Sequence, residues 1–184
     1  VAGTVGYMFC KIIGVKEKKH IFRGVQLGIA MQFTNIARDV EEDLKRKRIY
    51  IPKLMRNYKK ADYSKILKND EIKKQFSISL KELLGKADQI YNNAWEGIYK
   101  LPLRFRLPIG IAAELYQQIG KKIKKKKYNI WNQRVYLTKL EKLFFFIKVI
   151  IRVLYTKKVV INHDIDNQII RSIKNTDIKF YEKF

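Results

Sequence analysis

Residues 32–52 read QFTNIARDVEEDLKRKRIYIP, and this stretch carries the pattern that decides the fold class. Steps of three and four residues return to the same face of an α-helix, so oxygen-bearing side chains at this spacing form one narrow stripe. The stripe consists of Gln32, Asn35, Asp39 and Asp43. The residues that lead into it are mostly apolar, which predicts a largely buried helix over residues 17–46.

The aspartates of this stripe need partners, because an unpaired charge in a protein interior costs several kcal/mol. Carboxylate and amide oxygens are the ligands that Mg²⁺ prefers, and proteins often share Mg²⁺ with substrate phosphates. The stripe therefore predicts a site for Mg²⁺ (or Mn²⁺) on one wall of a diphosphate-binding cavity, with Asp39, Asp43 and Asn35 as ligands. The alternative is an ordinary solvated helix face, on which two aspartates four residues apart are common.

An arginine and a tyrosine follow the stripe, shortly before Pro52. Proline disfavours a helical conformation at the residue that precedes it, so regular helix should end ahead of Pro52. We therefore expect Arg48 and Tyr50 to lie at the mouth of the same cavity.

Segment 32–52 resembles the second aspartate-rich motif of the squalene/phytoene synthase family, whose members join two prenyl diphosphates head to head. The form Asn-Ile-Ala-Arg-Asp at 35–39 is most similar to the phytoene synthase branch. Three further stretches resemble family segments in the family's order: the small-residue helix of the prenyl tunnel at 1–6, the penultimate long helix at 101–116, and the C-terminal segment at 128–135. The resemblance covers roughly residues 1–145. It implies an all-α, isoprenoid synthase-type helical bundle around a central cavity.

The resemblance also implies roles for individual residues. The catalytic residues would be Asp39, Asp43, Tyr50 and Tyr116, and the substrate-binding residues would be Gln32, Asn35, Arg38, Arg48, Arg134, Gly3, Val5 and Gly6. Guanidinium groups offer paired donors to phosphate oxygens, although one helical step places Arg38 about 100° from the aspartate face. From the residues alone, half-buried packing is the alternative for the tyrosines, and close helix packing is the alternative for the glycines.

The implied activity is that of a prenyltransferase, which condenses two geranylgeranyl diphosphates through a cyclopropyl diphosphate to phytoene in carotenoid biosynthesis. A squalene, dehydrosqualene or presqualene diphosphate synthase is the alternative within the family. A truncated, non-catalytic helical protein associated with a membrane is the alternative outside the enzymes. The family carries a first aspartate-rich motif on an earlier helix, and none stands ahead of Val1. We therefore expect the N-terminal helices to be missing and this chain alone to have little or no turnover.

The net charge of +23 raises nucleic acid as a partner. The basic residues are mostly lysine, and the densest run, at 121–127, lacks the interleaved aromatic residues and arginines that base recognition uses. This run instead suits the C-terminal end of a helix. The composition therefore argues against nucleic acid as a partner and favours anionic lipid headgroups as a peripheral partner. The substrates that the resemblance implies are prenyl diphosphates. The single cysteine, Cys10, excludes an internal disulfide and predicts a small apolar side chain in a helix.

Long stretches with helical periodicity predict helices at about 1–13, 17–46, 71–99, 104–126 and 132–155, with a weaker element near 53–67. Residues 1–155 would form the C-terminal part of one domain, and residues 156–184 would form a tail of unknown role without clear amphipathic order. The single cysteine fits a reducing compartment, so we expect a cytoplasmic protein, with peripheral membrane contact as an option. The oligomeric state does not follow from the sequence.

Segment 143–155 is strongly apolar but too short to span a bilayer, which needs about 20 residues. It predicts either the last core helix or a helix that lies in the membrane interface. We expect the core helix.

Overall fold

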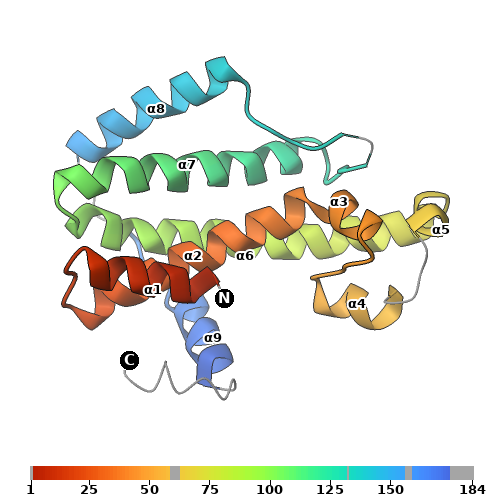
Figure 1. Ribbon diagram of the computed structural model, residues 1–184, viewed down its shortest axis with the longest axis horizontal. Coiled ribbons are helices and arrows are strands. Elements are labelled where there is room, and N and C mark those ends of the chain that lie inside the picture. The colour runs from red at the N-terminus through yellow and green to blue at the C-terminus, as the bar shows by residue number, and fades with distance from the viewer. Residues whose placement is uncertain (1, 59–62, 132, 156–158, 175–184) are drawn as a thin grey trace.

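The computed structural model describes residues 2–58, 63–131, 133–155 and 159–174 (Figure 1). Within these residues the fold is all-α and contains no strand, as the sequence predicts. The helices are α1 (Ala2–Ile12), α2 (Lys18–Arg38), α3 (Val40–Lys45), α4 (Pro52–Tyr58), α5 (Tyr63–Leu67), α6 (Asp70–Lys100), α7 (Leu103–Lys125), α8 (Lys139–Leu154) and α9 (His163–Lys174). Val1 and Asn132, which belong to two of the family-like stretches, lie outside the described residues.

Helix α2 is the element that the other helices share. It packs against α1, α6 and α7, and these helices run roughly parallel to one another (Figure 1). Val25, Ala30 and Ala37 of α2 are completely buried in these contacts. The short helices α3, α4 and α5 gather at one end of the long helix α6, where Leu44, Leu54, Ile66 and Phe76 form a core cluster.

The predicted helix over 17–46 is wrong in one respect, because it is broken at Asp39. The backbone of Asp39 (φ −102°, ψ 10°) ends α2 and begins α3. Two hydrogen bonds of helical spacing nevertheless cross the bend, from Asp39 N to the Asn35 carbonyl (2.9 Å) and from Asp43 N to the Asp39 carbonyl (2.8 Å). The oxygen-bearing residues therefore stay on successive turns, although the helix axis bends between them.

The predicted helix over 132–155 is also wrong at its start, because α8 begins only after Thr138. The Thr138 hydroxyl accepts from the Glu141 backbone N–H, and the Glu141 carboxylate accepts from the Thr138 backbone N–H. This reciprocal capping satisfies two backbone donors that a helix start leaves without partners, and so it defines the first turn.

Helices α1 and α2 touch backbone to backbone. A Cβ atom added at Gly6 would stand 2.1 Å from the Gly24 carbonyl oxygen, and one added at Gly28 would stand 2.2 Å from the Ala2 carbonyl oxygen. Gly3 is buried in the same contact, and Cys10 is buried beside Gly24, as predicted for a small apolar side chain. Gly3 and Gly6 therefore take part in close helix packing, one of the two roles that the sequence left open for them.

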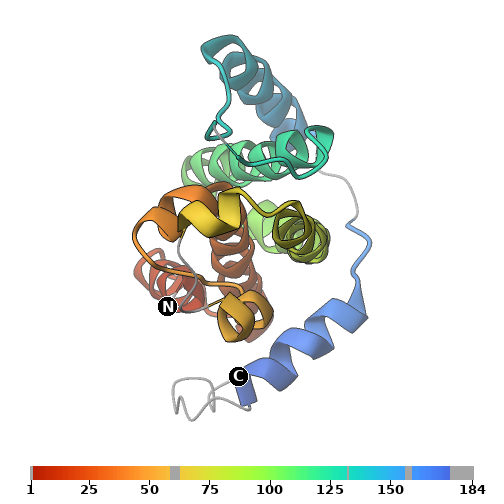
Figure 2. The same cartoon turned by 90° about the vertical axis from the view of Figure 1, so that its right-hand side faces the viewer.

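Helix α9 is absent from the prediction, which expected no regular element beyond residue 155. Ile165 and Ile169 pack against Ala30 of α2 and Ala87 of α6. The helix lies obliquely across the outside of the bundle (Figure 2). The remaining parts of the predicted tail, 156–158 and 175–184, lie outside the described residues.

One buried polar cluster fastens α9 to the bundle. The Arg23 side chain, 4% exposed, donates through Nη1 to both carboxylate oxygens of Asp166 at 2.8 Å. Asn93 donates to the same carboxylate at 2.7 Å, and Arg23 Nε also donates to Glu96 at 2.8 Å. The charge of Arg23 is thus neutralised by acids from two elements, α6 and α9.

Helix α8 is not the core helix that the sequence analysis expected. The structure describes all of α8, and only Val149 and Val153 of this helix are buried. It lies on the outer side of α7, at the edge of the molecule (Figure 2). Across the described parts of the chain, no helix has both the length and the apolar character needed to cross a bilayer.

Asp166→Ala should lower the free energy of unfolding by about 3 kcal/mol, because it removes one of the acids that neutralise the buried Arg23 charge. Asp164→Ala is the matched control, since Asp164 is exposed in the first turn of the same helix, and it should cost less than about 1 kcal/mol. Urea unfolding of both variants measures the difference. Equal losses would contradict the anchoring role of the Asp166 carboxylate.

Gly6→Ala should destabilise the protein by about 1–3 kcal/mol, because the new methyl group meets backbone atoms that cannot turn away. Gly85→Ala is the control: nothing lies within 4 Å of its added Cβ, so alanine should stabilise helix α6 by about 0.5–1 kcal/mol. Thermal unfolding of both variants should give shifts of opposite sign. A neutral Gly6→Ala would show that the α1–α2 contact is looser than the structure has it.

Candidate diphosphate site

An apolar cavity of about 220 Å³ lies between α1, α2, α6 and α7. Val5 and Gly6 of α1 line it together with Met31 of α2 and Ala112 of α7, whereas Gly3 is buried in the α1–α2 contact. The structure therefore brings two of the three predicted tunnel residues to one cavity.

The oxygen-bearing stripe lies beyond this cavity along α2. Met31 and Ala112 are the last residues of α2 and α7 that line the cavity. Asn35 stands one helical turn beyond Met31, and Tyr116 stands one turn beyond Ala112. The Tyr116 hydroxyl lies close enough to Arg38 to help raise the pKa of that guanidinium, after the larger effect of the hydrogen bond to Asp39 and against the effect of burial. Residues from α2 and α7 thus meet in a polar cluster just beyond the Met31 and Ala112 end of the apolar cavity, which we call its polar end.

Two arginines hold the carboxylate of Asp39. Arg38 donates through Nε to Oδ1 and through Nη2 to Oδ2, both at 2.8 Å. Arg134, from the segment before α8, donates through Nε and Nη2 to Oδ1 at 3.0 and 2.9 Å. Burial raises the pKa of Asp39, but the hydrogen bonds and charges of the two arginines outweigh it and hold that pKa below its ordinary value. Asp39 is therefore ionised and already paired.

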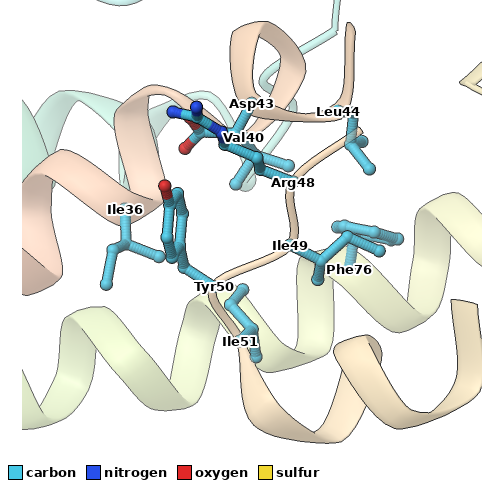
Figure 3. Close-up of a pocket in the computed structure, with 9 residues that line it drawn as sticks. All are labelled: Ile36, Val40, Asp43, Leu44, Arg48, Ile49, Tyr50, Ile51 and Phe76. Atoms are coloured by element: carbon cyan, nitrogen blue, oxygen red, sulfur yellow. The ribbon is translucent and has the colours of Figure 1, made fainter. Parts of the chain in front are cut away.

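Asp43 has the opposite electrostatic setting. Burial raises the pKa of Asp43, and the negative charges of Asp39 and Glu42 raise it further. Asp43, Arg48 and Tyr50 line a recess of about 10 Å³, with their side chains extending toward the same end of it (Figure 3). Arg48 and Tyr50 therefore lie beside the second aspartate, in a recess separate from the apolar cavity, and the Tyr50 side chain is half exposed.

The oxygen atoms of this region suit a hard divalent cation. The Oδ1 atom of Asn35 is buried and has no hydrogen-bond partner, and a buried carbonyl oxygen without a partner loses several kcal/mol of solvation. A cation held by Asn35, Asp39 and Asp43 would satisfy this oxygen and would lower the raised pKa of Asp43. No group of three or more His, Cys, Asp or Glu residues that could hold a metal occurs in the described part of the chain. The chain therefore contributes two carboxylates and one amide to such a site.

Gln32 is exposed and lies one turn before Asn35 and Ile36 on α2, so it joins the stripe without a packing role. The predicted polar site residues thus gather around the C-terminal end of α2, whereas the predicted tunnel residues Gly3, Val5 and Gly6 lie on α1.

Sequence reasoning missed a second group of buried polar residues. Glu114 of α7, 1% exposed, accepts from Lys148 at 2.9 Å and from Arg152 at 3.3 Å, and both donors belong to α8. Burial raises the pKa of Glu114, but hydrogen bonds from Lys148 and Gln118 lower it below its ordinary value. The Arg152 guanidinium also stands 3.6 Å from the centre of the Trp95 ring. The only signal in the sequence was an acid inside an otherwise apolar stretch, IGIAAEL.

Long helices that enclose an apolar cavity with an oxygen-rich mouth are the architecture of the isoprenoid synthases. Residues 1–141 match the squalene/phytoene synthase family, and the chain belongs to this family. The matched region ends within the first turn of α8 and excludes α9.

Several phytoene synthases are similar to this chain. The 15-cis-phytoene synthase of Pantoea ananas is 34% identical over 146 residues, which covers 78% of this chain and 46% of that protein. The phytoene synthase of Rhodobacter capsulatus is 34% identical over 144 residues, with 78% and 42% covered, and that of Arthrospira platensis is 35% identical over 159 residues, with 78% and 50% covered. The chain spans about half the length of these relatives.

Asn35→Leu should raise the free energy of unfolding by about 1–2 kcal/mol in the absence of metal, because it removes a buried oxygen without a partner. Asn93→Leu is the control, because the Asn93 amide donates to Asp166 and to the Asn162 carbonyl, and its loss should destabilise the protein. Chemical denaturation compares the two variants. A destabilised Asn35→Leu protein would mean that its Oδ1 atom does have a partner.

Proposed function

We propose that this chain forms the part of a phytoene synthase-type prenyltransferase that binds the diphosphate, in an enzyme that joins two geranylgeranyl diphosphates head to head. One observation carries the proposal: the stripe of Asn35, Asp39 and Asp43 begins one helical turn beyond Met31, the last α2 residue that lines the apolar cavity, and two arginines hold its Asp39 carboxylate. The similarity to proteins named phytoene synthase supports the choice of reaction.

The residues of the polar end would bind and orient the diphosphate. Asp39, Asp43 and Asn35 would hold Mg²⁺ or Mn²⁺, which when bound acts as a Lewis acid on the diphosphate oxygens. Arg38 and Arg134 donate to Asp39 in the structure, and their planar guanidinium groups can offer the same paired donors to a diphosphate. Arg48 would add a third cation beside Asp43.

The apolar cavity would hold the prenyl chain and exclude water. Departure of a diphosphate leaves an allylic cation, which water would capture in an open site. The walls near the polar end carry Met31 and Ala112, and Tyr116 continues the α7 wall with an aromatic face that can stabilise positive charge. Tyr50 would act similarly from the side of Asp43.

Two carboxylates are few for a site that must hold a diphosphate through several divalent ions. We therefore expect the chain by itself to bind diphosphate together with a divalent cation, but to form little or no product. Formation of phytoene by the purified chain from geranylgeranyl diphosphate and Mg²⁺ would contradict this expectation.

A chimera tests the proposed reaction. Residues 1–141 replace the matching region of the Pantoea ananas protein, and we expect the chimera to form phytoene from geranylgeranyl diphosphate. Asp39→Asn should lower this rate by at least about 100-fold, because the site then lacks one ligand charge. Asp70→Asn is the control, since Asp70 is an exposed residue of the first turn of α6.

Electron paramagnetic resonance of Mn²⁺ with inorganic diphosphate gives a readout that does not depend on turnover. The unaltered chain and Asp70→Asn should bind Mn²⁺, whereas Asp39→Asn and Asp43→Asn should not. Equal Mn²⁺ binding by all four proteins would overturn the metal assignment, and an active Asp39→Asn chimera would overturn the reaction mechanism.

A further inference from the structure

The outward side of α8 is a continuous apolar surface. Its residues follow one another at steps of three and four, so they share the helix side that faces away from Val149 and Val153, the two residues buried against the bundle. This outer face consists of Leu140 (79% exposed), Leu143 (56%), Phe144 (64%), Ile147 (50%), Ile151 (54%) and Leu154 (66%). Large apolar side chains exposed together in this way mark an interaction surface.

Lysines lie near the N-terminal end of this outer face. Lys139 and Lys142 are exposed in the first turn of α8: Lys139 stands beside the outer face, and Lys142, seven residues before Val149, stands on the opposite side of the helix. The exposed Lys125, Lys126 and Lys127 follow at the end of α7, next to α8, because Lys122 of the same α7 turn is bridged to Glu141 of α8 at 2.7 Å.

The acids close to α8 do not offset these lysines. Glu141 is neutralised by Lys122, and the buried Glu114 is neutralised by Lys148 and Arg152. The outer face therefore presents apolar side chains together with unbalanced positive charge, on a chain whose net charge is +23.

We propose that the outer face of α8 docks this protein onto a lipid bilayer that carries anionic headgroups. Helix α8 has 16 residues and is about 24 Å long at about 1.5 Å per residue, too short for the hydrocarbon core of about 30 Å, so it lies in the plane of the interface. Its apolar side chains enter the acyl boundary while the lysines contact the headgroups.

The composition of the surroundings favours lipid over a protein partner. Lysine is depleted at protein–protein interfaces, whereas apolar helix faces flanked by lysine are typical of helices that bind anionic membranes. This inference does not rest on the proposed reaction, because every observation behind it lies outside the candidate diphosphate site.

Vesicle flotation of the purified chain tests the proposal. The protein should float with vesicles of phosphatidylcholine and phosphatidylglycerol, and should float much less with vesicles of phosphatidylcholine alone. Ile147→Glu should weaken binding to the anionic vesicles by at least about tenfold, because it places a charge where an apolar side chain would enter the bilayer. Ile78→Glu is the matched control: Ile78 is 48% exposed on α6, almost the same as Ile147, and its variant should bind like the unaltered chain.

A fluorescent label separates insertion from loose electrostatic contact. An environment-sensitive dye on Leu143→Cys should shift its emission to shorter wavelength with anionic vesicles, while the same dye on Ile78→Cys should not. Circular dichroism verifies that the variants keep their helices. Failure of the unaltered chain to float, equal floating of Ile147→Glu, or a stable dimer in light scattering without vesicle binding would each overturn the proposal, and the last would assign the outer face to a second copy.

Discussion

The contact between the backbones of α1 and α2 is the constraint on which the rest of the molecule depends. At Gly6, Gly24 and Gly28 the two helices approach until no side chain fits between them, and this fixes where α1 stands. Helix α1 forms one wall of the apolar cavity, and α2 carries the oxygen-bearing stripe. The same contact therefore sets the distance between this apolar wall and the stripe. Larger residues at this crossing would move the wall, not merely loosen a core.

Ion pairs between different elements also determine the arrangement of the helices. The chain has 40 basic residues and 17 acidic ones, and several of the acids pair with a basic residue of another element. The buried Glu114 ties α8 to α7 and the buried Asp166 ties α9 to α2, whereas the partly exposed Asp39 ties the segment of Arg134 to the end of α2. Removing one partner from a buried pair leaves an uncompensated charge, so the two buried pairs specify which elements meet.

The parts of the fold that periodicity determines were predictable. The spacing of apolar residues gives α1, α6 and α7 within about one residue of their observed ends, but it misplaces the end of α2 and the start of α8. The oxygen-bearing stripe keeps its successive turns despite the bend at Asp39. The bend itself was not predictable, because no proline or glycine marks it. The late start of α8 follows from the Thr138–Glu141 capping box. This pattern is present in the sequence, but the prediction relied on apolar periodicity alone and placed the start of the helix too early. The pairing of Arg38 with Asp39 was not predicted either, because an ideal helix points adjacent side chains in directions about 100° apart. The arginine side chain is long enough to bend back and bring its guanidinium to the Asp39 carboxylate.

The pair between Arg23 and Asp166 joins residues 143 positions apart, and this separation has a consequence for the order of folding. The pair between Arg23 and Glu96 closes a loop of 73 positions, about half as long. Because a longer loop costs more chain entropy before its contact forms, the Arg23–Glu96 pair can form before α9 docks, and the arrival of Asp166 then completes the neutralisation of Arg23.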